Sequence, residues 1–337
     1  MRILIVGVGA LGGTVATRAL RAGMPVWLAT RTADSAQVLR SSGLRVSGIG
    51  GTSTAECVHV APIAEYAGQK FELIVLATKA HDALEAAPFL LNLLVSGGAL
   101  LPIQNGGVSQ MLSDRLGSGA VLGGLSNLGA TMIQPGVYEQ RNAGYILIGE
   151  LAGGFSQRVG NIAKTLSVAV ETRVTPNLRG ALWAKLLINC SVTTLGAIAA
   201  RTMRQYITSF SGKEVFRHTY GEALSVALGN GTRPERMIVE PIPPGWHGTI
   251  VPGNDYDAWI EQIVAVYGDL KPSMLQDFER GRQTEVDFIN GYVARLGRQI
   301  GVPIAMNAAI VDMVHAIEQR QLRPDSSRID ELLRKVE

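Results

Sequence analysis

Residues 3–12, with the sequence ILIVGVGALG, decide the fold class of this chain. The four apolar residues at 3–6 have the length of a buried strand, and the apolar spacing of residues 10–21 is typical of a helix. Residues 7–12 join the two segments with the pattern G-x-G-x-x-G. In such a loop the first glycine permits a tight turn, the second lets the backbone approach a pyrophosphate, and the third lets the helix pack closely on the strand. Because the pyrophosphate rests on the helix N-terminus, the predicted dinucleotide-binding residues are Gly7, Gly9, Ala10, Leu11 and Gly12.

The same alternation of strand and helix continues through the first half of the chain. Apolar runs predict further strands at Pro25–Ala29, Glu72–Ala77 and Ala99–Ile103, and the spacing of Ala83–Leu94 predicts a helix between the last two. Strands that alternate with helices indicate a parallel sheet with crossover helices. Residues 121–148 are strand-like with turns, and we expect them to extend the same sheet in antiparallel fashion.

From about residue 177 the sequence changes to helical spacing and strand signals nearly vanish. We therefore predict an N-terminal Rossmann-type dinucleotide-binding α/β domain at residues 1–175 and an all-α substrate and catalytic domain at residues 176–337. Within the second domain, residues 230–254 are rich in Gly and Pro and predict a long loop or insertion. The predicted helices are Leu178–Ala199, Lys213–Leu228, Asp255–Tyr267, Met274–Ile300 and Ile304–Gln319.

Composition and charge exclude several classes of protein. The 337 residues are 47% hydrophobic, which is enough for a sizeable core, and the net charge of +3 is too small to indicate a nucleic-acid partner. Two cysteines and five scattered histidines give no disulfide framework and no metal site. The uncharged stretch 86–103 contains two prolines and a Ser-Gly-Gly turn, so a helix, a turn and a strand explain it better than a membrane span. The apolar run at the N-terminus is too short for a signal peptide, and we expect a cytoplasmic protein without membrane contact.

Three polar side chains follow the predicted strands on the side where such sheets bind ligands. Arg31 stands where an NAD enzyme usually carries Asp or Glu, so it favours a 2′-phosphate and hence NADPH; a solvated surface arginine is the alternative. Lys79 can neutralise a phosphate or a substrate carboxylate, and the Asn105 amide, followed by Gly-Gly, can approach the nicotinamide end. For these two residues an exposed lysine and an Asn-Gly turn are the alternatives.

Further motifs make the sequence similar to the ketopantoate reductases (2-dehydropantoate 2-reductases) over nearly its whole length. Besides the glycine pattern, Arg31, Lys79 and the QNG around Asn105, the resemblance rests on three stretches of the second half. These stretches are LWAKLLINCSVTTLGAI at 182–198, PSMLQDFERGRQTEVDFINGYV at 272–293 and GVPIAMN at 301–307. The resemblance implies an oxidoreductase of pantothenate biosynthesis that reduces ketopantoate to pantoate with NADPH.

The resemblance also implies roles for side chains of the second domain. Lys185 would donate the proton to the developing alkoxide, and burial would lower its ordinary pKa of about 10.4 toward neutral pH. Asn189, four residues on, would hold the oxygens of the substrate, and Asn105 and Ser273 would bind the substrate as well. Glu285 is a catalytic position too, although the sequence does not separate a contact with the cofactor, the substrate or Lys185.

One departure from the family leaves the identity of the substrate open. Thr193 is a predicted substrate-binding residue at a position where family members often carry a second Asn. It keeps a hydroxyl but loses the paired donor and acceptor of an amide. The alternatives are a paralogue that reduces another 2-oxo acid, and a non-catalytic NADPH-binding sensor. The expected partner is a small 2-oxo acid, no metal is expected, and a homodimer is plausible from the apolar helical domain.

Overall fold

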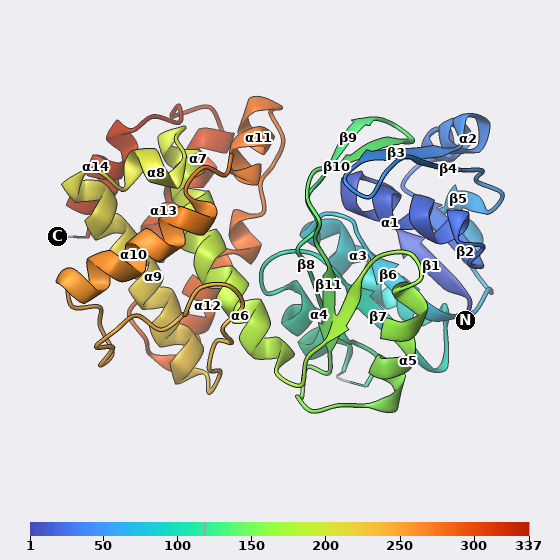
Figure 1. Cartoon of the computed structure of the whole chain (residues 1–337), viewed down its shortest axis with the longest axis horizontal. Helices are drawn as coiled ribbons and strands as arrows, with labels where there is room; N and C mark the ends of the chain where they lie inside the picture. The colour runs from blue at the N-terminus through green and yellow to red at the C-terminus, as the bar shows by residue number, and fades with distance from the viewer. Residues whose placement is uncertain (118, 337) are drawn as a thin grey trace. The chain divides into compact units, whose positions relative to one another are not determined.

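The structure, a computed structural model, describes residues 1–117 and 119–336. The chain divides into two compact units, Met1–Leu178 and Arg179–Glu337. In Figure 1 the first unit is coloured from blue to green and the second from yellow-green to red.

A five-stranded parallel sheet forms the centre of the first unit, as predicted. The strand order is β5-β2-β1-β6-β7, and Val6 of β1 pairs with Ala29 of β2 and with Leu76 of β6. All four residues of β1 are buried, as expected for a parallel strand that is covered on both faces. The strands are β1 (Ile3–Val6), β2 (Val26–Thr30), β5 (Val60–Pro62), β6 (Phe71–Leu76) and β7 (Leu94–Pro102).

Helices connect these strands and place every strand-to-helix turn at one edge of the sheet. Helix α1 follows β1 and α3 follows β6, so the polar residues at the starts of these helices share the carboxyl edge with the ends of the strands. The helices of the first unit are α1 (Ala10–Arg21), α2 (Ala33–Ser42), α3 (Ala80–Leu91), α4 (Val108–Leu116), α5 (Gln157–Leu166) and the 3₁₀ turn η1 (Ile63–Tyr66).

The prediction that residues 121–148 extend the central sheet is wrong. One bridge joins Val121 to Leu100 of β7, but the strands that follow belong to two other sheets, ordered β4-β3-β10-β9 and β12-β11-β8. Strand β10 pairs in parallel with β3, and this sheet packs on α1, a pairing between distant segments that the local pattern does not contain. The strands are β3 (Leu44–Gly48), β4 (Ser53–Ala55), β8 (Gly123–Ser126), β9 (Ala130–Gln134), β10 (Val137–Gln140), β11 (Ile146–Gly149) and β12 (Thr172–Val174).

The second unit is helical, as predicted, but its first long helix is not uniform. Helix α6 (Leu178–Ile188) passes into a π-helical turn, η2 (Asn189–Thr193), and continues as α7 (Thr194–Ala199). When a π-helical turn interrupts an α-helix, it often does so at a functional site. The whole segment is long and apolar enough to span a membrane, yet 78% of its most apolar window is buried inside the protein, as in a core helix.

The prediction of one helix over Met274–Ile300 is wrong. The segment forms α11 (Ser273–Glu279), the 3₁₀ turn η3 (Val286–Phe288) and α12 (Asn290–Ile300). Gly281 ends the first piece with φ +60°, a left-handed conformation that glycine adopts at little cost. The break places Glu285 in a turn and not on a helix surface.

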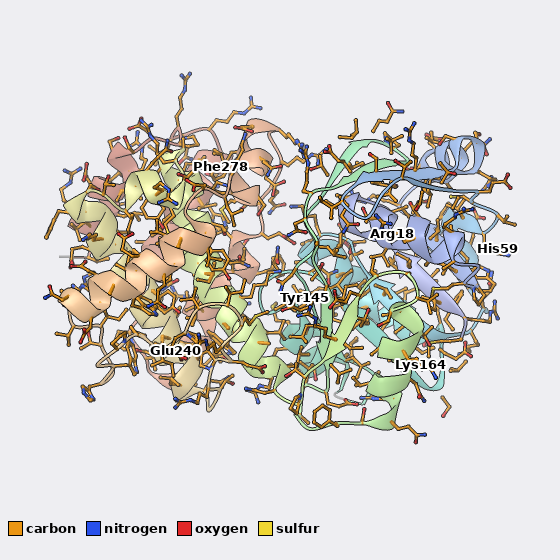
Figure 2. The ribbon with its side chains drawn as sticks, in the orientation of Figure 1. Arg18, His59, Tyr145, Lys164, Glu240 and Phe278 are labelled. Carbon is orange, nitrogen blue, oxygen red and sulfur yellow. The ribbon has the colours of Figure 1, made fainter. Side chains whose placement is uncertain are left out.

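The predicted loop over residues 230–254 is present and is anchored on aromatic side chains. Trp259 Nε1 donates to the carbonyl of Glu240 at 2.7 Å, and the Tyr220 hydroxyl donates to the carbonyl of Pro241 at 2.7 Å. Glu240 is labelled in Figure 2. The remaining helices are α8 (Met203–Tyr206), α9 (Phe210–Gly229), α10 (Asn254–Tyr267), α13 (Ala305–Glu318) and α14 (Ser327–Arg334).

Candidate functional site

The glycine loop of the first unit has the geometry of an anion-binding turn. Gly7 has φ +94°, and a Cβ on Gly12 would lie 2.0 Å from the carbonyl oxygen of Gly7, so neither position accepts a side chain without strain. A Cβ on Gly9, in contrast, would meet no described atom within 4 Å, which leaves open space in front of the loop. Gly9 supplies no side-chain cap to α1, and no acidic residue lies in the first turn of that helix. The amides of this turn therefore fit a pyrophosphate.

Tyr138, which the sequence did not single out, supports this loop from the second sheet. It is fully buried on β10, and its hydroxyl donates to the carbonyl of Val8 at 2.9 Å. A Cβ on Gly13 would lie 2.0 Å from the Tyr138 ring, so the glycine after the G-x-G-x-x-G pattern makes room for the tyrosine. The doubled glycine at 12–13 was the only local signal, and the partner lies more than a hundred residues away.

Arg31 lies just beyond β2 and forms an ion pair that the sequence reasoning missed. Its guanidinium donates to the carboxylate of Asp82, in the first turn of α3. The Arg31 side chain is 75% exposed and that of Asp82 is 32% exposed. The neighbouring Thr32 is the N-cap of α2, and its hydroxyl oxygen accepts a hydrogen bond from the Ser35 amide at 3.2 Å.

Lys79 and Asn105 both lie at the carboxyl edge of the sheet, as expected. Lys79 is exposed at the N-cap of α3, and Asn105 is half-buried three residues after β7. The residues just before them, Thr78 and Gln104, have buried polar atoms that the sequence did not reveal. Within the described residues, the hydroxyl of Thr78 and both amide atoms of Gln104 are buried without a hydrogen-bond partner. Such orphaned polar atoms are costly and point to a ligand at this edge.

Lys185 and Glu285 come together in the second unit. Lys185 lies half-buried on α6, and burial lowers the pKa of its ammonium to about 8. The negative charge of Glu285 opposes this effect and raises the pKa. The turn fixes Glu285, because its carbonyl accepts from the amides of Phe288 at 3.0 Å and Ile289 at 3.1 Å. A lysine with this pKa remains mostly protonated at neutral pH yet gives up its proton more readily than an exposed lysine.

Asn189 opens the π-helical turn and has a free donor. Its Nδ2 is buried without a hydrogen-bond partner among the described residues, whereas its carbonyl accepts from the hydroxyls of Thr193 at 2.9 Å and Thr194 at 3.0 Å. The Thr193 hydroxyl, which we predicted to bind substrate, therefore donates its proton to a backbone carbonyl. Two other carbonyls of the turn are also paired, that of Cys190 by Asn290 at 3.3 Å and that of Ser191 by the Tyr206 hydroxyl at 2.6 Å.

Ser273 is exposed at the start of α11, which packs on α7. A Cβ on Gly196 would lie 2.9 Å from the ring of Pro272, so this glycine lets the start of α11 approach the continuation of the Lys185 helix. The structure thus places Lys185, Asn189 and Ser273 along one helix and its immediate neighbour. Cys190, which follows Asn189, is a fully buried thiol, and burial raises its pKa.

Comparison with known proteins identifies the family from both halves of the chain. Residues 3–153 match the sequence profile described as "Ketopantoate reductase PanE/ApbA", and residues 177–318 match "Ketopantoate reductase PanE/ApbA C terminal". The chain belongs to the ketopantoate reductase family. It is therefore an oxidoreductase with a Rossmann-type domain followed by a helical one, as the motifs predicted.

Individual relatives of this family agree over nearly the full length. The 2-dehydropantoate 2-reductase of Pyrococcus horikoshii is 29% identical over 331 residues, which cover 94% of this chain and 98% of the relative. That of Mesorhizobium japonicum is 26% identical and covers 94% and 98%. The crystal structure of a PanE/ApbA family ketopantoate reductase from Ralstonia eutropha superposes with a TM-score of 0.79 at 25% identity, covering 95% of this chain and 99% of that one. D-mandelate dehydrogenase with NADH and anilino(oxo)acetate shares the fold, with a TM-score of 0.79 at 21% identity and coverage of 95% and 99%.

Proposed function

We propose that this protein reduces ketopantoate (2-dehydropantoate) to pantoate with NADPH, and that Lys185 is the proton donor. The observation that carries the proposal is the pair of Lys185 and Asn189 on one helix: an ammonium with a pKa of about 8, and a buried amide donor that has no partner in the part of the chain that the structure describes. Reduction of a carbonyl next to a carboxylate requires a proton donor and a hydrogen-bond donor for the substrate oxygens. The names of the relatives support the choice of ketopantoate.

The first unit would hold the cofactor. The amides of residues 9–12 would bind the pyrophosphate, Arg31 would pair with the 2′-phosphate, and Lys79 would neutralise phosphate charge. Asn105 and the orphaned Gln104 amide would lie toward the nicotinamide. When bound, the reduced nicotinamide supplies a hydride to the carbonyl carbon of the 2-oxo acid.

In the second unit Lys185 would polarise the carbonyl and then give its proton to the alkoxide oxygen. Glu285 would keep Lys185 protonated, because its charge opposes the effect of burial on the pKa. Asn189 would donate its free Nδ2 hydrogens to the substrate, and Ser273 would add a hydroxyl. Thr193 would contribute only as an acceptor, since its proton is donated to the Asn189 carbonyl.

A second candidate function is the reduction of another branched 2-oxo acid by the same residues. Thr193 favours it, because a threonine that is turned to the backbone leaves more room and fewer donors than the asparagine common in the family. For both candidates we expect activity in the cytoplasm on small soluble metabolites. Retention of the proton donor argues against a sensor that only binds NADPH.

The test is steady-state NADPH oxidation, followed at 340 nm, with ketopantoate and with 2-oxoisovalerate, which lacks the hydroxymethyl group. We expect a higher kcat/KM for ketopantoate, because polar groups that bind its hydroxyl are left unpaired by the analogue. Robust turnover of 2-oxoisovalerate without activity on ketopantoate would select the second candidate. Binding of NADPH without oxidation by any 2-oxo acid in a panel would overturn both.

A further inference from the structure

The pair of Arg31 and Asp82 crosses the place where the glycine loop begins. Arg31 follows β2, Asp82 lies in the first turn of α3 after β6, and β1 lies between these two strands in the sheet. A contact from one to the other therefore passes over the carboxyl end of β1, from which the loop at residues 7–12 departs. The adenosine half of a dinucleotide bound on that loop would have to meet this ion pair.

The charge on Asp82 is unfavourable for a 2′-phosphate. A phosphate monoester carries about −1.5 to −2 charges at neutral pH, and a carboxylate on the same guanidinium both competes with it and repels it. The 2′-hydroxyl of NADH carries no charge and can donate a hydrogen bond to a carboxylate. Asp82 thus opposes the preference that Arg31 creates.

We propose that Asp82 is a specificity-determining residue that competes with the 2′-phosphate of NADPH for Arg31 and so limits the preference for NADPH over NADH. This inference rests on the proposed function, in which Arg31 binds that phosphate. The exposure of both side chains, 75% and 32%, makes the exchange of partners feasible without unpacking the core.

The test is direct binding of NADPH and NADH to purified D82N, measured by isothermal titration calorimetry without substrate. We expect NADPH to bind about two- to fivefold more tightly than to the parent, the range that exposed ion pairs span. NADH should bind equally well or more weakly. At high salt the increase in NADPH affinity should become smaller, because exposed charges are screened. The same contrast should appear with the fragments 2′,5′-ADP and AMP, which lack the nicotinamide.

Glu85→Gln is the matched control. It removes the same charge from the same helix, one turn further on, where Glu85 is exposed and lies 3.9 Å from His81. The Glu85 carboxylate lies within 4.8 Å of that of Asp82, whereas the ion pair of Arg31 is with Asp82, so the control should raise the ratio of NADPH to NADH affinity clearly less than D82N does. If E85Q raises the ratio as much as D82N, the effect is the net charge of the helix and the competition is overturned. Unchanged or weaker NADPH binding by D82N overturns it as well.

Arg31→Ala separates this inference from the proposed function. If R31A does not weaken NADPH binding, the assignment of Arg31 itself fails. If R31A weakens it and D82N gives no gain, only the role of Asp82 fails. In the R31A background, D82N should no longer increase the affinity for NADPH. An increase of full size there would mean that Asp82 simply repels the 2′-phosphate, and it would contradict competition for Arg31.

Discussion

The two units place functional groups in opposite ways. In the first unit the predicted contacts are backbone amides of a glycine loop and side chains at the surface, such as Arg31 and Lys79. In the second unit they are side chains on and around one helix, where the half-buried Lys185 has a lowered pKa and the buried Asn189 amide has no hydrogen-bond partner among the described residues. The first arrangement suits recognition of a charged ligand by geometry. The second suits chemistry, because low solvent exposure shifts a pKa and strengthens each hydrogen bond.

The sharpest test of this division is removal of the Lys185 amine. Lys185→Ala should lower kcat by at least about 10²-fold, as expected for a positioned acid, while the Kd for NADPH stays close to that of the parent. Turnover and calorimetric binding on the same preparation measure the two effects. Lys164→Ala, at an exposed lysine of α5 in the first unit (Figure 2), should change neither. Near-normal turnover of K185A would contradict the assignment of Lys185 as the proton donor.

The complementary change in the first unit should affect binding and not chemistry. Arg31→Ala should weaken NADPH about ten- to a hundredfold, because a hydrogen bond to a charged group contributes about 1.5–3 kcal/mol, and NADH should be nearly unaffected. Titration with both cofactors measures this. Arg21→Ala, an exposed arginine at the end of α1, is the control. Preference of the parent protein for NADH would contradict the assignment.

The pH dependence distinguishes a buried acid from a surface charge. Because the pKa of Lys185 is about 8, kcat should be constant at lower pH and fall as the pH rises through 8 and the ammonium loses its proton. Glu285 raises that pKa, so Glu285→Gln should move the fall to lower pH. Asp287→Asn is the control, since Asp287 lies two residues on and faces His315 at 3.1 Å. A profile of E285Q that coincides with the parent would remove Glu285 from this role.

The smallest expected effect concerns the support of the glycine loop. Tyr138→Phe keeps the ring that packs on Gly13 and removes the hydroxyl that donates to Val8. NADPH should bind about two- to tenfold more weakly, the range of a neutral hydrogen bond of about 0.5–1.5 kcal/mol, with kcat unchanged. Tyr145→Phe, where Arg173 stacks on the ring at 3.9 Å, should bind NADPH like the parent. A loss of kcat in Y138F would show that the tyrosine does more than hold the loop.

Much of the fold could be predicted because its signals are local. The apolar run at 3–6, the glycine pattern and the helix at 10–21 appear in the structure at their predicted places. The extension of the sheet by residues 121–148 and the single helix over 274–300 were wrong for different reasons. Pairing of β10 with β3 joins distant segments, whereas the break at Gly281 was visible as a glycine but was outweighed by the apolar spacing around it.

The candidate site divides in the same way. Arg31, Lys79 and Asn105 could be predicted because each follows a strand, and the end of a strand marks the binding edge of such a sheet. Lys185, Asn189, Ser273 and Glu285 could be predicted only through the family motifs, since a lysine in an apolar helix ordinarily extends to solvent. Their roles stay predictions until the variants above are measured.

The sequence by itself determined the first strand, the helix after it, the dinucleotide loop between them and the helical character of the second half, because strand length, helical spacing and the glycine pattern depend on neighbours within a few residues. Only the tertiary structure decided three contacts: the Tyr138 hydroxyl donates to the Val8 carbonyl, Asp82 forms an ion pair with Arg31, and Glu285 raises the pKa of Lys185. The physical reason is that hydrogen bonds, ion pairs and burial act over a few ångströms in space. The partners here are separated by 130, 51 and 100 residues along the chain, where no local pattern connects them.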